Sequence, residues 1–98
     1  MAIRVDPEAR EVAALRAAAE WSRAEVLEIG CGDGRLSLRL ASLGAQVTAI
    51  DPEPSLVRKA RKSLPKRLDG RVRYSVGSSG KLRFPSRWFD IVVFSWSL

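Results

Sequence analysis

Histidine is absent from this sequence, and cysteine occurs only once, as Cys31. The missing histidine excludes imidazole acid–base catalysis and histidine metal ligation. One cysteine excludes a disulfide framework and a cysteine metal cluster, so we expect no metal site. Long apolar runs are also missing, because the longest fall far below the ~20 residues that span a bilayer. The first ten residues carry acidic side chains and no apolar core, unlike a secretory signal. These absences predict a cytoplasmic protein without a membrane partner.

Positive charge is concentrated between Arg58 and Arg73. The formal net charge is +6, and this stretch holds eight basic side chains against one acidic residue, Asp69. One interpretation is attraction to an anionic partner such as RNA. The other is the solvated face of a surface helix and the loop after it. We favour the solvated face, because no aromatic residue is interleaved for base stacking before Tyr74.

Helical and strand patterns alternate along the 98 residues, which are enough for one domain. Asp6 and Pro7 predict a helix start, and that helix fades near residues 21–22. Further helices are predicted over residues 35–44 and 52–64, and strands over residues 25–30, 45–51, 71–77 and 89–96. This alternation indicates an α/β fold with a parallel sheet and right-handed crossovers. Ligands of such folds bind at the carboxyl ends of the strands.

The segment "GCGDG", residues 30–34, follows the first strand of this alternation and places glycines at every second position. A dinucleotide fingerprint needs its third glycine where Arg35 stands, and a P-loop needs a G-K-[ST] ending. Both phosphate-binding patterns are therefore missing. Glu28, just before the turn, places a carboxylate near the ligand, which suits a cationic group and repels a pyrophosphate.

Asp51 ends the second strand, ~20 residues beyond the glycines, where such folds bind a ribose diol through an acid. The two carboxylates together indicate a nucleoside with its ribose at Asp51 and an ammonium-bearing part near Glu28. S-adenosylmethionine has both features and carries no phosphate.

The stretch "VLEIGCGDGRLSLRLASLGAQVTAID" resembles the cofactor-binding part of the class I S-adenosylmethionine-dependent methyltransferases. The resemblance implies that Asp51 binds the ribose and that Pro52 lies beside the adenine. It assigns the methionine end of the cofactor to Glu28, Gly30, Cys31, Gly32 and Gly34. Asp51 is also a candidate N-cap for the helix that follows it.

The later stretch "VGSSGKLRFPSRWFDIVVFSWSL" is similar to the family's run into its fourth strand. Ser78 and Ser79 stand where the family usually has Asp and a small residue beside the adenine. The resemblance places Ser95 near the reacting methyl group. The Asn-Pro-Pro-Tyr type of motif found in amino-group methyltransferases of nucleic acids is missing here, where "SWSL" stands instead.

The implied fold is a Rossmann-like three-layer sandwich with a parallel sheet in the order 3-2-1-4. The family's full order is 3-2-1-4-5-7-6, so we expect residues 1–98 to be a single, incomplete cofactor-binding domain. Strand four would then be an exposed edge, and its apolar sequence would favour self-association.

The resemblance implies direct methyl transfer from S-adenosylmethionine to an unidentified acceptor, with a small molecule favoured. A sulfonium leaving group needs no dedicated base when the acceptor is already nucleophilic, so no catalytic residue is assigned. Two alternatives stay open: a non-catalytic module that keeps a truncated cofactor fold, and a basic RNA-associated protein.

Overall fold

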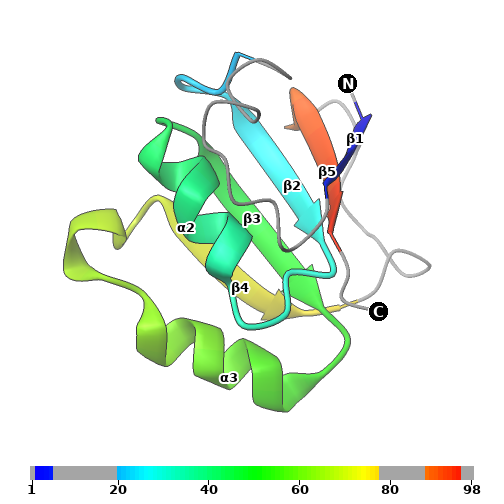
Figure 1. The fold of residues 1–98 in the computed structure, drawn as a ribbon, viewed down its shortest axis with the longest axis vertical. Coiled ribbons are helices and arrows are strands. Elements are labelled where there is room, and N and C mark those ends of the chain that lie inside the picture. Colours follow the sequence, from blue (N-terminus) through cyan, green and yellow to red (C-terminus); the bar gives the residue numbers. More distant parts are fainter. Residues whose placement is uncertain (1, 6–19, 78–87, 96–98) are drawn as a thin grey trace.

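The computed structural model describes residues 2–5, 20–77 and 88–95. They form a five-stranded sheet in the order β1-β5-β2-β3-β4, in which every pair of neighbouring strands is parallel (Figure 1). The strands are β1 (Ala2–Val5), β2 (Glu25–Ile29), β3 (Gln46–Asp51), β4 (Val72–Val76) and β5 (Ile91–Ser95). Between them lie α2 (Arg35–Ser42), α3 (Pro54–Ser63) and the short 3-10 helix η1 (Lys66–Leu68).

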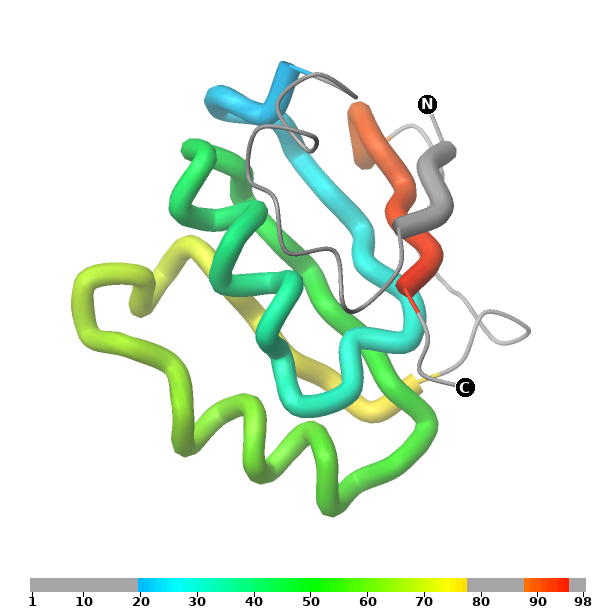
Figure 2. The backbone as a smooth tube through the Cα atoms, viewed as in Figure 1, coloured from blue at the N-terminus to red at the C-terminus, as the bar shows by residue number. Residues whose placement is uncertain are grey.

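The predicted strand order is confirmed for four of these strands. The neighbours β4-β3-β2-β5 are the predicted strands three, two, one and four, in the order 3-2-1-4. Figure 2 shows the chain stepping from β2 through α2 to β3, and then through α3 to β4. Most of the helix predicted from Asp6 lies outside the described residues.

Strand four is not an edge, so that prediction is wrong. Its counterpart β5 pairs with β2 on one side and with β1 on the other, where Ile3 is in register with Val93. A strand with two neighbours has its backbone groups paired on both sides, which suits the doubly apolar sequence of β5. Self-association through an exposed β5 edge therefore loses its basis. The strand that covers it, β1, was not predicted.

The core lies between the sheet and the two helices, which cover the same face (Figure 1). Right-handed crossovers that step in one direction place successive helices on one side of a parallel sheet. From this face of the sheet, Val26, Val47 and Val93 are buried against Leu40 of α2 and Val57 of α3. This packing fixes the helices on the sheet, with α2 beginning just after the carboxyl end of β2 and α3 just after that of β3.

The helix ends follow local chemistry. Gly34 is the N-cap of α2, and Gly44 beyond its end has φ +100°, a conformation that favours glycine. Glu53, and not Asp51, is the N-cap of α3, because its side chain accepts the Ser55 N–H at 3.2 Å. Asp51 is therefore not engaged in capping.

Candidate cofactor site

The glycine turn joins the end of β2 to the start of α2. Gly30, Gly32 and Gly34 have φ values of +83°, +57° and +90°. Side chains with a Cβ seldom adopt this left-handed region. The alternating glycines are therefore required by the backbone path, which turns sharply at each of them.

Four backbone N–H groups of the turn donate hydrogen bonds to other groups of the protein. Gly30 and Cys31 both donate to the carbonyl oxygen of Ile50, at 2.9 and 3.0 Å, and Gly34 donates to Cys31 O at 3.0 Å. Gly32 donates to Asp51 Oδ2 at 2.9 Å. A phosphate-binding turn needs such groups pointing at the ligand. This turn offers none of these four, which agrees with the missing phosphate motifs.

The glycines at positions 32 and 34 serve different purposes. A Cβ at Gly32 would meet no atom within 4 Å, so its left-handed backbone favours glycine there and no neighbouring atom among the described residues does. A Cβ at Gly34 would lie 2.5 Å from Tyr74 Oη and 2.9 Å from its Cζ. Gly34 is therefore explained by packing, whereas Gly32 leaves open space over the backbone.

Asp51, the acid predicted to bind the ribose, is hydrogen-bonded to the glycine turn. Its Oδ2 accepts the Gly32 N–H and its Oδ1 accepts the Glu53 N–H at 2.9 Å. The side chain is largely buried at the carboxyl end of β3. A carboxylate oxygen has two lone pairs, so each oxygen keeps one acceptor position. Asp51 is thus fixed in place and still able to accept hydroxyl hydrogens.

Glu28 is completely buried beneath the surface of the site. Its Oε2 accepts the Ser95 hydroxyl at 2.7 Å, and its Oε1 accepts the Ser37 hydroxyl. Burial raises the pKa of the Glu28 carboxyl above its ordinary value, although both hydroxyl bonds pull it down in part. The Glu28 carboxylate is therefore not exposed to a ligand, and it can influence the site only through Ser37 and Ser95.

Cys31 is buried and has no acidic thiol. Burial, followed by the nearby charges of Glu28 and Asp51, raises its pKa to about 12. A thiol in this state is a poor nucleophile, because the thiolate is the reactive form. Cys31 thus contributes a small side chain and its backbone to the turn.

A hollow opens at the turn, and several predicted residues meet there. It is lined by Gly30, Cys31, Gly32, Asp33, Arg35, Leu36, Leu56 and Ser95. Four of these were predicted as site residues, including Ser95 from the end of β5. Pro52 is exposed at the start of the segment before α3. Ser78 and Ser79 lie outside the described residues.

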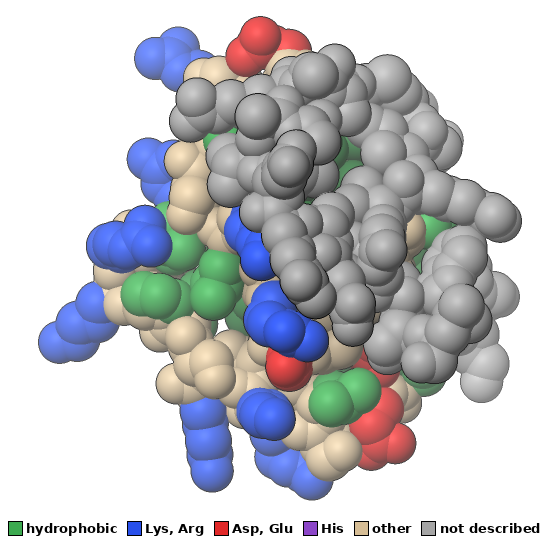
Figure 3. All heavy atoms as spheres, viewed as in Figure 1, with side chains coloured by type: hydrophobic (Ala, Val, Ile, Leu, Met, Phe, Trp, Pro, Cys, Tyr) green, Lys and Arg blue, Asp and Glu red, His purple; other side chains and the backbone are tan. Residues whose placement is uncertain are grey.

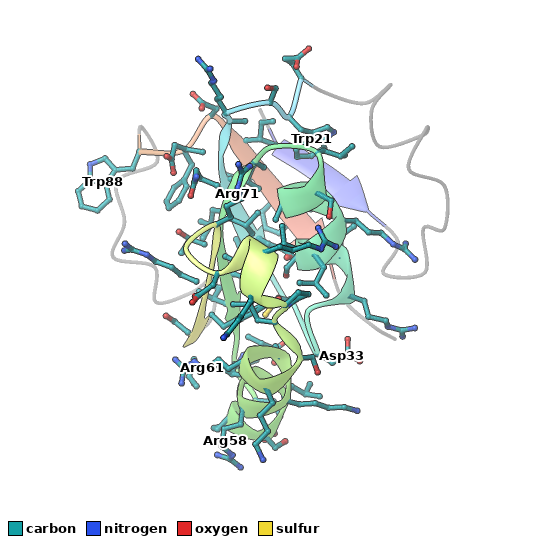
Figure 4. All side chains as sticks on the ribbon, turned by 90° about the vertical axis from the view of Figure 1, so that its left-hand side faces the viewer. Trp21, Asp33, Arg58, Arg61, Arg71 and Trp88 are labelled. Atoms are coloured by element: carbon teal, nitrogen blue, oxygen red, sulfur yellow. The ribbon has the colours of Figure 1, made fainter. Side chains whose placement is uncertain are left out.

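Sequence reasoning missed Asp33, Arg35, Leu36 and Leu56 as lining residues. Asp33 and Arg35 form an ion pair of 3.6 Å at the start of α2, and Figure 4 shows Asp33 near that end of the helix. Asp33 lies within the quoted glycine segment, so its position was a usable signal. Leu56 comes from the first turns of α3, and nothing in the sequence marked it.

The basic stretch lies away from this hollow, on α3 and the chain after it. Lys and Arg side chains project from the lower left of the face in Figure 3, over α3 and η1. Figure 4 shows Arg58 and Arg61 on α3 and Arg71 near the start of β4. Every basic side chain of residues 58–73 is exposed. Arg61 also donates to the Tyr74 carbonyl at 2.7 Å.

Among the described residues, no helix is long and apolar enough to cross a bilayer. No group of three or more His, Cys, Asp or Glu side chains in those segments is arranged to hold a metal ion.

Comparison with known sequences identifies relatives of this chain. The profile of a family described as a methyltransferase domain matches residues 26–98. The mitochondrial ubiquinone biosynthesis O-methyltransferase of Schizosaccharomyces pombe is 43% identical over 74 residues, which are 74% of this chain and 27% of that protein. A ubiquinone biosynthesis O-methyltransferase of Xanthomonas euvesicatoria is 60% identical over 42 residues, which are 43% of this chain and 18% of that protein. The chain thus spans less than a third of the length of these two relatives.

Solved structures show the same fold. An S-adenosylmethionine-dependent methyltransferase from Mesorhizobium loti matches 87% of this chain and 38% of its own, with a TM-score of 0.74 and 28% identity. The magnesium protoporphyrin IX methyltransferase from Synechocystis, solved with bound S-adenosylmethionine, matches 85% of this chain and 39% of its own, with a TM-score of 0.71 and 27% identity. The family profile covers residues 26–98, and the strand order and the glycine turn agree with it. The chain therefore belongs to the class I S-adenosylmethionine-dependent methyltransferase family.

Proposed function

We propose that this chain binds S-adenosylmethionine at the glycine turn and serves as the cofactor-binding domain, over residues 1–98, of a methyltransferase. One observation carries the proposal. The N–H groups of Gly30, Cys31, Gly32 and Gly34 are used internally, while Asp51 and Asp33 place carboxylates around the turn. Such a site repels phosphate and favours a ligand with hydroxyl groups and positive charge.

The residues of the site fit this cofactor. Asp51 keeps one acceptor position on each oxygen for the two ribose hydroxyls. The open space over Gly32 admits a ligand against the backbone. Leu36 and Leu56 give the hollow apolar walls. When bound, S-adenosylmethionine supplies a methyl group on a sulfonium whose leaving thioether needs no activation.

The chain's own contribution to methyl transfer is binding and orientation. Ser95 stands at the end of β5, where it lines the hollow and donates to Glu28. Holding the reactants in line and keeping water out supplies most of what such a displacement needs. We assign no general base to the described residues, since an acceptor that is already nucleophilic does not require one.

We further propose a small-molecule acceptor that is methylated on oxygen. The support is the naming of two relatives as ubiquinone biosynthesis O-methyltransferases. A cytoplasmic location remains a prediction from composition, and one of those relatives is named as mitochondrial.

Isothermal titration calorimetry tests the cofactor assignment on the 98-residue chain. S-adenosylmethionine and S-adenosylhomocysteine are each titrated, with NAD as the competing dinucleotide. We expect both sulfur compounds to bind and NAD not to bind. Tighter binding of NAD than of either compound would contradict the proposal, and so would the absence of any binding by the folded chain.

A further inference from the structure

A chain of buried polar side chains crosses the fold beneath the glycine turn. It contains Tyr74 of β4, Ser37 of α2, Glu28 of β2 and Ser95 of β5. Ser37 and Ser95 each donate a hydroxyl hydrogen to a different oxygen of Glu28. The buried Tyr74 hydroxyl lies near this group, since Ser37 and Glu28 both influence its pKa. All four residues are at most 5% exposed, so solvent does not supply their partners.

Both ends of this chain reach the backbone of the turn. Ser95 Oγ lies 3.2 Å from the carbonyl oxygen of Gly30, the first glycine. Tyr74 Oη donates to the carbonyl oxygen of Gly34, the last glycine, at 3.4 Å. Asp51 holds the N–H of the middle glycine. The middle and last glycines are therefore held by hydrogen bonds, and the Glu28 carboxylate fixes the Ser95 oxygen beside the first.

The arrangement is costly for folding alone. An ionisable carboxyl in the interior carries a large desolvation penalty unless its oxygens are bonded. Here no buried side-chain polar atom among the described residues lacks a partner. An apolar side chain would avoid the penalty altogether. Buried ionisable groups kept in spite of such a cost gather at functional sites, and this one lies directly beside the predicted cofactor turn.

No sequence motif marked Ser37. It is fully buried on the face of α2 that also buries Leu36, Leu40 and Ala41. Serine and alanine differ by one hydroxyl, so Ser37→Ala removes the donor and keeps the shape. Nothing about packing requires a hydroxyl at this position, and its evident partner is Glu28 Oε1.

We propose that Ser37 is a positioning residue for cofactor binding, acting through Glu28 on Ser95, which lines the hollow beside the glycine turn. This inference rests on the proposed function. With its Ser37 donor in place, the Glu28 carboxylate has one fixed orientation and presents Oε2 to Ser95. This bond fixes the position of Ser95 beside Gly30 and the hollow. A turn fixed before binding loses less conformational freedom when the cofactor arrives.

The test compares Ser37→Ala with Ser42→Ala. Ser42 lies on the same helix, is exposed, and donates to Leu38 O at 2.8 Å. Each variant of the 98-residue chain is titrated with S-adenosylhomocysteine, after circular dichroism has verified the fold. We expect Ser37→Ala to weaken binding about tenfold, the size of one hydrogen bond to a charged group. Ser42→Ala should change affinity less than about twofold.

A double-mutant cycle with Glu28→Gln separates positioning from general destabilisation. If Ser37 acts through Glu28, the double variant binds about as weakly as the weaker single variant. The carboxyl carbon of Glu28, followed by ¹³C NMR, gives a spectroscopic readout. Its titration midpoint should rise in Ser37→Ala, because a hydroxyl bond to the ionised form is lost. The other ionisable groups facing Glu28 are Asp51, Cys31 and Tyr74, and the substitution leaves them in place.

The outcomes distinguish this inference from the proposed function. If the unsubstituted chain fails to bind S-adenosylhomocysteine, the proposed function falls and this inference with it. If that chain binds and Ser37→Ala binds equally well, only the role of Ser37 is contradicted. Losses from Ser37→Ala and Glu28→Gln that multiply in the double variant would also overturn it, since independent effects multiply. If Ser37→Ala does not fold, the titration of Glu28→Gln with S-adenosylhomocysteine takes its place. Weaker binding by Glu28→Gln would support the inference, and unchanged affinity would overturn it.

Discussion

The carboxylates at the glycine turn and the cations of residues 58–73 are the two most charged parts of the described chain, and the fold treats them in opposite ways. Glu28 and Asp51 are buried, and each of their carboxylate oxygens accepts a hydrogen bond from a defined donor. The basic side chains are exposed on α3, η1 and β4 (Figures 3 and 4). The carboxylates at the turn are buried and hydrogen-bonded, whereas the cations of residues 58–73 are exposed to water.

The contrast indicates where function resides. Removing a charged group from water costs several kcal/mol unless hydrogen bonds compensate, so a buried carboxylate needs a reason beyond stability. An exposed lysine or arginine costs little and contributes little. The organised acids therefore define the binding site, and the cations are best explained as a solvated surface. Each prediction below tests one side of this comparison, from the largest expected effect to the smallest.

Gly32→Val should abolish cofactor binding. The new side chain enters space that no described atom fills, so it competes with the ligand itself. We expect S-adenosylhomocysteine affinity to fall at least about 100-fold, roughly 2.7 kcal/mol. Gly70→Val is the matched control, because Gly70 also has a left-handed φ, +87°, and open space around it, but lies before β4. An equal loss of affinity in both variants would show that strain from a side chain at a left-handed position, and not ligand volume, explains the loss.

Asp51→Ala should cost about 1.5–3 kcal/mol of cofactor binding, roughly 10- to 150-fold in affinity. The substitution removes the ribose acceptor and also the bonds to the Gly32 and Glu53 N–H groups. Asp51→Asn keeps one acceptor oxygen and should lose less. Asp69→Asn makes the same change at an exposed acid in the basic region and should leave calorimetric affinity unchanged. Wild-type affinity in Asp51→Ala would remove this residue from the site.

Several features of this site were predictable because they depend on short stretches of sequence. The glycine spacing, the acid that ends the second strand and the apolar strand runs can each be read from a few consecutive residues. They led correctly to the sheet order and to the meeting of the turn with Asp51 and Ser95. The family resemblance supplied the distant part of that arrangement, since the strand carrying Ser95 is 65 residues from Gly30.

Other features depend on contacts that local patterns do not encode. The pairing of β1 with β5 joins residues 2–5 to 92–95, and four residues carry too little pattern to predict a strand. The sequence offered Asp51 as the N-cap of α3, but Glu53 takes that position while Asp51 is bonded to Gly32. Ser37 is one hydroxyl on an apolar helix face, and only the folded arrangement reveals its partner.

Glu28→Gln should make the folded chain more stable at neutral pH while weakening the cofactor site. Burial raises the pKa of Glu28 in the folded state, so the folded chain binds this proton more tightly than the unfolded chain does. The contribution of Glu28 to stability is then fully present below its ordinary value of 4.5 and is lost as pH rises through the raised pKa. Glutamine keeps the shape and cannot ionise.

Thermal unfolding of Glu28→Gln and wild type from pH 4 to pH 8 measures this difference. We expect the two midpoints to be closest at pH 4 and the variant to be more stable as pH rises above about 4.5. The glutamine amide has partners available, because Ser95 Oγ can accept from it and donate to Gly30 O instead. A variant less stable than wild type at pH 8 would mean that the ionised carboxylate stabilises the fold, contrary to the cost argued here.

The smallest effect is expected on the other side of the comparison, at Lys59 and Lys62 of α3. Both side chains are exposed, and Lys62 lies in the last turn, where a cation interacts favourably with the helix dipole. Replacing both with Gln should change the free energy of unfolding by no more than about 0.5 kcal/mol and cofactor affinity by less than about twofold.

A single-stranded RNA oligonucleotide, titrated over a range of salt concentrations, tests the alternative function of the basic stretch, RNA binding. If the region is a solvated surface, the RNA binds weakly and the double substitution changes little. Tight binding with a steep salt dependence that the substitution reduces would instead show that these cations bind phosphate groups. The exposed charges of this molecule would then have a function as well as the buried ones.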